Sequence, residues 1–441
     1  MLFSRRDLTR LIVPLVLEQT LAITIGMADT VMVTSVGEAA VSAISLVDSI
    51  NILLMGLFTA MATGGAIVTA QYLGREDRDN ARLSANQLIF TTTALSLVLM
   101  TLCLMGQRWL LTVIYGAVEP AVMQGAVTYF FWSALSYPFL AVYNGGAALF
   151  RVMGNSKVSL VCSALMNVVN IGGNALLIYG FGMGVAGAAI ASLASRALAA
   201  VVVTWLLRKP ECPLLLDGSI FMPHRRMIGR ILSLGIPNGL ENSMFQVGKI
   251  LIQGLVATMG TVAMAANAVS NSIAGFPNIA GNAVGLALVT VVGQCVGAGE
   301  LEQARHYTKT LQRVSWSMMI GLNLLLLAVV NPLVGAFHLS GETSALTVEI
   351  LVTYAIASIV CWTPSFLLPN GLRAAGDARF TMWVSAFSMW AFRIGGCFVY
   401  CNLLGLGVLG TWLAMYTDWL FRAIVFSCRH RGDRWLSKKV I

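Results

Sequence analysis

The chain has 441 residues, of which 57% are hydrophobic and 11% are charged, and its formal net charge is +9. A soluble domain averages roughly 45–50% apolar and about 25% charged residues, so this composition excludes a soluble globular protein and indicates an integral membrane protein. The basic residues lie in short clusters between apolar runs, which is typical of a membrane topology signal rather than of a surface for nucleic acid. We therefore expect no nucleic-acid partner.

Long apolar segments predict the membrane-spanning helices. Such a helix needs roughly 20 mostly apolar residues, and this rule predicts twelve helices in an all-α polytopic fold. Those of the first half are 11–36, 44–72, 86–108, 122–150, 158–180 and 185–207. Those of the second half are 230–259, 266–296, 310–332, 346–372, 380–403 and 406–428. We expect an N-terminal six-helix bundle at 1–207, a cytoplasmic linker at 208–229, and a C-terminal bundle with a basic cytoplasmic tail at 230–441.

The two halves repeat one another. Residues 14–37 align without a gap on residues 237–260, which lie 223 positions later, and RVMGNSK at 151–157 matches RAAGDAR at 373–379. A duplicated module is the simplest cause. Because each half has an even number of helices, both halves insert with the same orientation, and we expect a pseudo-two-fold axis along the membrane normal.

The loop charges provide an independent check of the helix count. Lys and Arg collect on the cytoplasmic side of short loops. With the amino terminus inside, 24 of the 28 Lys and Arg residues fall on the inside. One missed or extra helix would scramble this pattern, so it supports twelve helices and predicts a multi-pass protein with both termini in the cytoplasm.

Several ionisable residues lie inside the predicted helices. Such groups are costly at membrane depth, and those present usually face a water-filled cavity or a partner. They are Glu18, Asp29, Asp48 and Arg196 in the first half, and Glu241, Lys249, Arg393 and Asp418 in the second. Asp418 and Arg393 fall on adjacent helices, and we predict a structural ion pair for them.

Asp29 is the main candidate for ion exchange. It lies eleven residues after Glu18, which places both acids on one helix face about 16 Å apart. The matching position in the second half is Ile252, and Asp48 is likewise matched by Asn271, so these acids are specialised rather than scaffold residues. A carboxylate at this depth can exchange a proton or bind a cation. The alternative is a structural hydrogen bond to a neighbouring helix.

Glu18 and Glu241 occupy matching positions in the two halves. A duplicated acid either takes part in cation or proton coupling or braces the helix packing and the inner gate, and both roles are open. The eight cysteines show no metal or redox spacing, and we expect them to be small apolar fillers. No cofactor is expected other than the proton or cation that such a carboxylate can bind.

An amide stripe follows one face of the fifth helix. Asn167, Asn170 and Asn174 are three and four residues apart, which aligns their side chains. The stripe could bond across helices or line a cavity beside Asp29, and both interpretations are open. Asp48 is a further candidate for such a cavity.

Seven segments resemble one known family, the multidrug and toxic compound extrusion (MATE) transporters, over essentially the whole chain. They are GMADTVMVTSVGEAAVSA at 26–43, TAQYLGREDRDNAR at 69–82, LFRVMGNSK at 149–157, NIGGNALLIYGFGMGVAGAAIA at 170–191, TVVGQCVGAGELEQAR at 290–305, LRAAGDARF at 372–380 and RHRGDRW at 429–435. The resemblance implies two six-helix bundles that alternate between outward-open and inward-open states. It also implies export of amphipathic, often cationic, compounds in exchange for Na+ or H+.

The resemblance assigns roles to individual residues. Asp29 stands where the family has a first-helix acid tied to cation coupling, so it is the residue that would hold Na+. Asn170 matches a fifth-helix Asn near that acid, whereas Asn174 stands where a number of members have Asp, which removes one possible cation ligand. Asp377 matches an acid at the end of the tenth helix in some members. Glu241 comes about one turn before the seventh-helix acid of those members.

The family resemblance also sets the expected partners and the alternatives. We expect a small-molecule substrate, a bacterial inner membrane with lipid around the protein, and a monomer. A lipid-linked oligosaccharide flippase of the same superfamily is the nearest alternative, but it would have a strongly cationic cavity, whereas the polar residues here indicate an acidic and amide-rich one. A membrane-embedded enzyme would need paired His or clustered Asp motifs, and all four His fall in loops or at helix ends.

Overall fold

The computed structural model describes residues 2–116, 119–438 and 440–441, without the side chains of residues 25–30 and 219. All regular secondary structure within these residues is helical. Nine helical segments of this described part are long and apolar enough to cross a membrane, which confirms the prediction of an all-α polytopic protein. They are Glu38–Gly74, Arg78–Tyr115, Pro120–Val152, Ser156–Gly180, Gly184–Leu207, Thr261–Gly297, Leu301–Gly335, Gly341–Ala374 and Ala378–Leu403.

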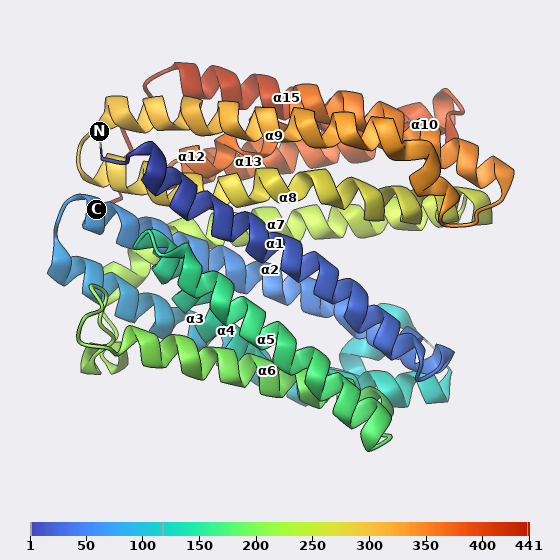
Figure 1. The fold of residues 1–441 in the computed structure, drawn as a ribbon, viewed down its shortest axis with the longest axis horizontal. Helices are drawn as coiled ribbons and strands as arrows, with labels where there is room; N and C mark the ends of the chain where they lie inside the picture. Colours follow the sequence, from blue (N-terminus) through green and yellow to red (C-terminus); the bar gives the residue numbers. More distant parts are fainter. Residues whose placement is uncertain (1, 117–118, 439) are drawn as a thin grey trace. The chain divides into compact units, whose positions relative to one another are not determined.

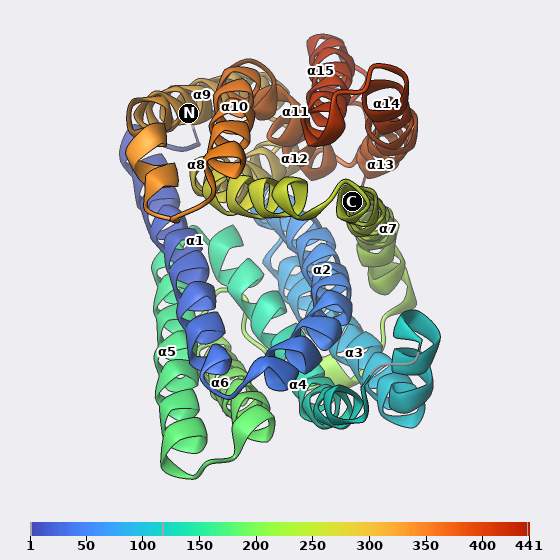
Figure 2. The same ribbon diagram turned by 90° about the vertical axis from the view of Figure 1, so that its right-hand side faces the viewer.

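Residues Ser4–Gly239 form one compact unit, the amino-terminal lobe, which also contains Ile441. Its helices are α1 (Arg5–Thr34), α2 (Glu38–Gly74), α3 (Arg78–Tyr115), α4 (Pro120–Val152), α5 (Ser156–Asn174), the π-helical η1 (Ala175–Gly180), α6 (Gly184–Leu207) and the 3₁₀-helical η2 (Gly218–Phe221). Helix α4 packs against α2, α3 and α6, and α5 packs against α1 and α6 (Figures 1 and 2). The lobe is therefore a bundle in which α4 is central.

Leu240–Val440 form the second unit, the carboxy-terminal lobe, together with the first residues of the chain. Its helices are the second part of α7 (Arg225–Ala257), α8 (Thr261–Gly297), α9 (Leu301–Gly335), α10 (Gly341–Ala357), η3 (Ser358–Trp362), α11 (Thr363–Phe366), α12 (Leu368–Ala374), α13 (Ala378–Ser388), η4 (Met389–Ile394), α14 (Gly395–Cys397), η5 (Phe398–Leu403) and α15 (Gly407–Arg431). Helix α8 packs against α9, α10 and α12, and α15 packs against α11 and η4. The last helix, α15, thus packs against two other segments of the bundle.

The division between the two units falls inside α7, between Gly239 and Leu240. The segment expected as a linker, 208–229, is not loosely attached, because two buried amides of α3 hold it. Asn86 donates to the carbonyl of Leu215 at 3.2 Å, and Gln87 accepts from the backbone N–H of His224 at 2.9 Å. The connector is therefore part of the amino-terminal lobe.

The repeat seen in the sequence is visible in the backbone at the turn between the fifth and sixth helices of each half. Gly182 and Gly184 have φ of 64° and 55°, and their counterparts Gly405 and Gly407 have φ of 66° and 54°. These left-handed values favour glycine, which has no Cβ to clash. Both halves therefore make the same turn with the same residues.

Small residues allow close helix contacts in the amino-terminal lobe. A Cβ added at Gly64 of α2 would lie 2.6 Å from the backbone N of Gly235 in α7, and one at Gly146 of α4 would lie 1.9 Å from Val203 in α6. Lipid tails are as apolar as the side chains, so close backbone packing rather than hydrophobic burial holds such helices together.

We predict that Gly64→Leu lowers the stability of the amino-terminal lobe. The backbone of Gly235 cannot move aside without shifting α7, and overpacking of this kind costs about 1–3 kcal/mol or more. Thermal unfolding in detergent, followed by tryptophan fluorescence, would show a lower melting temperature. Gly172→Ala is the matched control, because no atom lies within 4 Å of its added Cβ, and an unchanged melting temperature for Gly64→Leu would contradict the prediction.

Candidate functional site

The two acids of α1 stand on one helix, as the sequence predicted. Arg5–Thr34 is a continuous α-helix that contains both Glu18 and Asp29. The side chain of Asp29 lies outside the described residues, so its predicted role as a cation or proton site stays a prediction. Among the side chains that the structure does describe, no three His, Cys, Asp or Glu residues come together to hold a metal ion.

Glu18 is buried in an ion pair with an arginine of α4. Its Oε1 lies 3.4 Å from Nη1 of Arg151, and the hydroxyl of Ser159 in α5 donates to its Oε2 at 2.8 Å. Arg151 also donates to the Ser159 hydroxyl at 3.2 Å. The three side chains therefore tie α1, α4 and α5 together.

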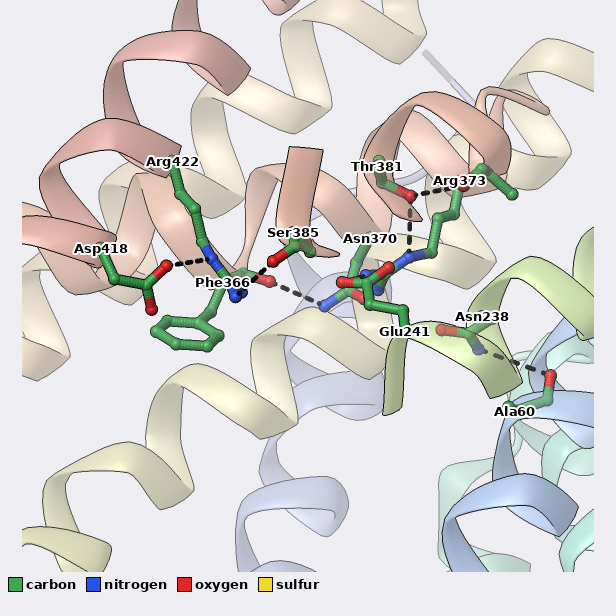
Figure 3. A network of polar contacts seen from close by, with 11 residues as sticks. Ala60, Asn238, Glu241, Phe366, Asn370, Arg373, Thr381, Ser385, Asp418 and Arg422 are labelled. Atoms are coloured by element: carbon green, nitrogen blue, oxygen red, sulfur yellow. Dashed lines mark hydrogen bonds and ion pairs between the residues drawn. The ribbon is translucent and has the colours of Figure 1, made fainter. Parts of the chain in front are cut away.

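Glu241 forms the equivalent ion pair in the carboxy-terminal lobe, but here the hydroxyl contacts only the arginine of the pair. Its Oε1 lies 2.5 Å from Nη2 of Arg373, whose Nε donates to Thr381 at 3.2 Å and whose Nη1 donates to Asn370 at 2.9 Å. Figure 3 shows these side chains from α7, α12 and α13 turned toward one another. An acid, an arginine and a hydroxyl therefore join three helices in each lobe.

The two triads are equivalent in the duplicated sequence. Glu18 aligns with Glu241, and Arg151 with Arg373. Sequence reasoning placed both arginines in cytoplasmic loops and did not foresee them as partners of the acids, although their match in the repeat was visible. Of the two roles left open for these acids, the ion pairs favour bracing of the helices, and the coupling role stays a prediction.

Asp48 of α2 lies in a polar network with α4. The amide of Asn51 donates to its Oδ1 at 3.1 Å, and the hydroxyl of Tyr129 donates to the same oxygen at 3.3 Å. Tyr137 donates to Asn51 at 2.8 Å. Asp48 is half-buried, so these contacts orient its carboxylate without enclosing it.

The amide stripe of α5 is partly used to join helices. Asn170 donates to the hydroxyl of Ser192 in α6 at 3.1 Å, whereas Asn167 donates to Ser163 of its own helix at 3.4 Å. Asn174, the last residue of α5, is fully buried. The hydrogen bond of Asn170 to Ser192 therefore favours, for this residue, the interpretation that the stripe bonds across helices.

Asp377 is held by the end of the chain's last helix. Arg429 of α15 donates through Nε to Asp377 at 2.7 Å, and its Nη2 lies at the same distance. Asp377 directly precedes α13 and is buried. Its predicted role as a cavity residue stays a prediction, and its ion pair joins the start of α13 to the last turn of α15.

Asp418 and Arg393 form the ion pair predicted from the sequence, with Oδ2 and Nη1 3.8 Å apart. Arg422, on the same helix as Asp418, adds a closer pair at 2.9 Å and donates to the backbone carbonyl of Ser385 (Figure 3). Lys249 of α7 lies near this group, over the ring of Phe245. Basic side chains therefore outnumber acids around Phe245, whereas the expectation of an acidic, amide-rich cavity stays a prediction.

A pocket of about 370 Å³ opens in the amino-terminal lobe, where α2 turns into α3 beside the start of α7. Its wall is basic. The lining residues are Tyr72, Arg75, Asp77, Asn80, His224, Arg226, Met227, Arg230 and Ile441. These arginines belong to the clusters predicted to face the cytoplasm, so the pocket lies at a helix end rather than at membrane depth.

Known proteins match the chain over its full length. A family model described as MatE matches residues 14–176 and 237–399, one match in each half. The chain is 24% identical over 447 residues to the "Probable multidrug resistance protein NorM" of Thermotoga maritima, a match that covers 99% of this chain and 94% of that protein. It is 25% identical over 432 residues to the "Uncharacterized transporter YisQ" of Bacillus subtilis, with 96% and 94% covered.

The fold is also found among solved structures. One structure described as the "Outward-facing conformation of a multidrug resistance MATE family transporter of the MOP superfamily" superimposes with a TM-score of 0.90 at 17% identity, covering 96% of this chain and 94% of that one. This likeness confirms the predicted two-lobed, twelve-helix fold. With a family match in both halves, the chain belongs to the multidrug and toxic compound extrusion (MATE) family, whose members are membrane transporters and not enzymes.

Proposed function

We propose that this transporter is a secondary antiporter that exports amphipathic, cationic small molecules in exchange for Na+ or H+. Membership of the family makes it a multi-pass transporter of small molecules. The names of its relatives, such as the multidrug resistance protein of Thermotoga maritima, support export of more than one compound. The relatives' names also make a lipid-linked oligosaccharide flippase the weaker alternative.

The observation that carries the proposal is the difference between the two lobes at one position of the repeat. Asp29 stands in α1, whereas the matching residue Ile252 in α7 packs against the apolar core of the carboxy-terminal lobe. A duplicated scaffold that needed an acid here would have it twice. An acid in one lobe only, at membrane depth, is therefore a candidate for ion exchange.

Glu18 and Glu241 are weaker candidates for the coupling role. An arginine already balances the charge of each carboxylate, at 3.4 Å for Arg151 and at 2.5 Å for Arg373. A Na+ ion would have to compete with the guanidinium at Oε1 of each acid, which disfavours coupling at these positions. We therefore assign these acids to the bracing of each lobe.

The proposed mechanism needs only that ion and substrate compete for one acid. Release of the coupling ion to the cytoplasm restores the charge of Asp29, which attracts a cationic substrate. Binding of an ion from the outside then neutralises the carboxylate and releases the substrate in the outward-facing state. The ion gradient drives the cycle because it changes the population of the two states through their different affinities.

The remaining features of the proposal follow from the loop charges and the relatives. We place the protein in the inner membrane of a bacterium as a monomer, with both termini in the cytoplasm. The basic loop clusters support this orientation.

We predict that Asp29→Asn abolishes ion-driven efflux, with a loss of about tenfold or more in rate, because the amide cannot gain or lose a charge. The measurement is efflux of ethidium from proteoliposomes under separately imposed Na+ and H+ gradients. The gradient that drives wild-type efflux identifies the coupling ion.

Glu38→Gln is the matched control, since Glu38 is exposed in the first turn of α2 and its neutralisation should leave efflux unchanged. Equal melting temperatures in detergent would show that all the proteins are folded. Wild-type rates from Asp29→Asn under both gradients would remove Asp29 from the mechanism.

A second prediction concerns the bracing role of Glu18. Removing one partner of a buried ion pair leaves a buried charge and costs about 3–5 kcal/mol, so Glu18→Gln should lower the melting temperature strongly. Glu18→Gln combined with Arg151→Gln should be less destabilising than the sum of the single changes, because the two side chains contact each other.

Asp433→Asn provides the surface control for this pair. Asp433 is 88% exposed in its ion pair with Arg305, and exposed pairs contribute about 0–1 kcal/mol. If Glu18→Gln kept the wild-type melting temperature but lost efflux, the coupling role would stand and bracing would be wrong.

A further inference from the structure

Three cationic side chains lie around one half-buried aromatic ring of the carboxy-terminal lobe. Nζ of Lys249 lies 4.9 Å from the ring centroid of Phe245, and the guanidinium carbons of Arg393 and Arg422 lie 5.1 Å and 5.6 Å from it. They come from α7, η4 and α15. Helices far apart in the sequence therefore bring three positive charges to one place.

Only one carboxylate balances these charges in the described part of the chain. Asp418 pairs with Arg422 at 2.9 Å and more loosely with Arg393 at 3.8 Å, and it also accepts from Ser388. Arg422 donates in addition to the carbonyl of Ser385. Oδ1 of Asp418 is thus bound by Arg422, its Oδ2 has no hydrogen bond among the described residues, and one carboxylate stands against three positive charges.

The guanidinium of Arg393 has an N–H donor without an acceptor among the described residues. Its side chain is 10% exposed, its ion pair with Asp418 is longer than a hydrogen bond, and its Nε has no hydrogen-bond acceptor among the described residues. A buried polar group without a partner is costly, and a guanidinium presents five N–H donors in a fork that matches a carboxylate. Arg393 also lies in the π-helical η4, and π-helical segments often occur at functional sites.

Lys249 is exposed and makes no ion pair with any described residue. A lysine in a membrane helix can extend its chain toward the nearer membrane surface. The ammonium of Lys249 instead lies over Phe245, one helical turn earlier. No carboxylate of the described residues pairs with this charge, so it is available to a ligand.

Aromatic side chains line the same place. Phe245 and Phe366 are both half-buried, with ring centroids 6.5 Å apart in an edge-to-face arrangement. Phe366 in turn stacks on Trp362 at 5.2 Å. Cations next to partly exposed rings fit a ligand that carries a negative charge on an aromatic body.

We propose that Lys249, Arg393 and Phe245 form a subsite in the carboxy-terminal lobe for the carboxylate of an aromatic amphipathic substrate. The guanidinium of Arg393 binds the carboxylate through its free donor, Lys249 adds the second charge, and the aromatic body packs on Phe245 and Phe366. The subsite rests on the proposed export function and refines its substrate class, since some substrates then carry an anionic group.

The test measures binding of 1-naphthoate to the purified, full-length protein in detergent by isothermal titration calorimetry. The uncharged 1-naphthamide has the same rings and is the matched ligand. We expect naphthoate to bind about tenfold more tightly than the amide, as one charge-assisted hydrogen bond would give. Lys249→Met should remove this preference, Lys249→Arg should keep it, and Lys309→Met, on the exposed surface of α9, should leave it unchanged.

Arg393→Met should also remove the preference, but this change can affect folding because Arg393 pairs with Asp418. Lys249→Met keeps the proposal testable, since Lys249 has no ion-pair partner to leave behind in the described structure. Equal binding of naphthoate to the wild type and Lys249→Met would overturn the proposal. Protection against unfolding by phosphatidylglycerol that depends on Lys249, without a response to naphthoate, would overturn it in favour of a lipid headgroup.

The result is independent of the antiport mechanism. Binding is measured without an ion gradient, so failure of Asp29→Asn to change efflux would not alter the naphthoate preference. Conversely, a protein that does not bind naphthoate but exchanges ethidium for Na+ or H+ would refute the subsite alone.

Discussion

A charge inside a membrane protein is costly unless a partner or water balances it, and this constraint shapes both lobes. Glu18 with Arg151, and Glu241 with Arg373, each join three helices where lipid supplies no hydrophobic force to hold them together. Either member of a pair alone would be an uncompensated buried charge. In each six-helix bundle, one glutamate–arginine pair therefore holds three helices together.

The two lobes share this brace and differ in the charges that remain. At the position of Asp29 the second half has Ile252, and at the position of Asn170 it has Arg393. The first lobe thus keeps acids and amides, whereas the second has gained basic groups around Phe245. The two copies of one scaffold therefore differ at a few interior positions, and Asp29 and Arg393 are two of the residues that differ in charge.

Sequence reasoning predicted the helices because their signal is local. The segment expected at 44–72 is α2 at Glu38–Gly74, since apolar length determines where a helix can span. The pair of Asp418 and Arg393 was also foreseen, because adjacent helices restrict the possible partners. Arg151 and Arg373 were missed as partners of the two glutamates. Both lie near helix ends, where a sequence alone suggests a charged loop residue, and only the packing of a distant helix shows that they are paired.

The interior charges divide into two kinds, and the division follows from energetics. A carboxylate already paired with arginine gains little from a passing ion, so it can keep a lobe rigid while the transporter changes state. A group without a full partner, such as Arg393 with its free Nε, has binding energy left for a ligand. The repeated acids Glu18 and Glu241 are therefore the candidates for stability, whereas the unrepeated Arg393 is the candidate for ligand binding.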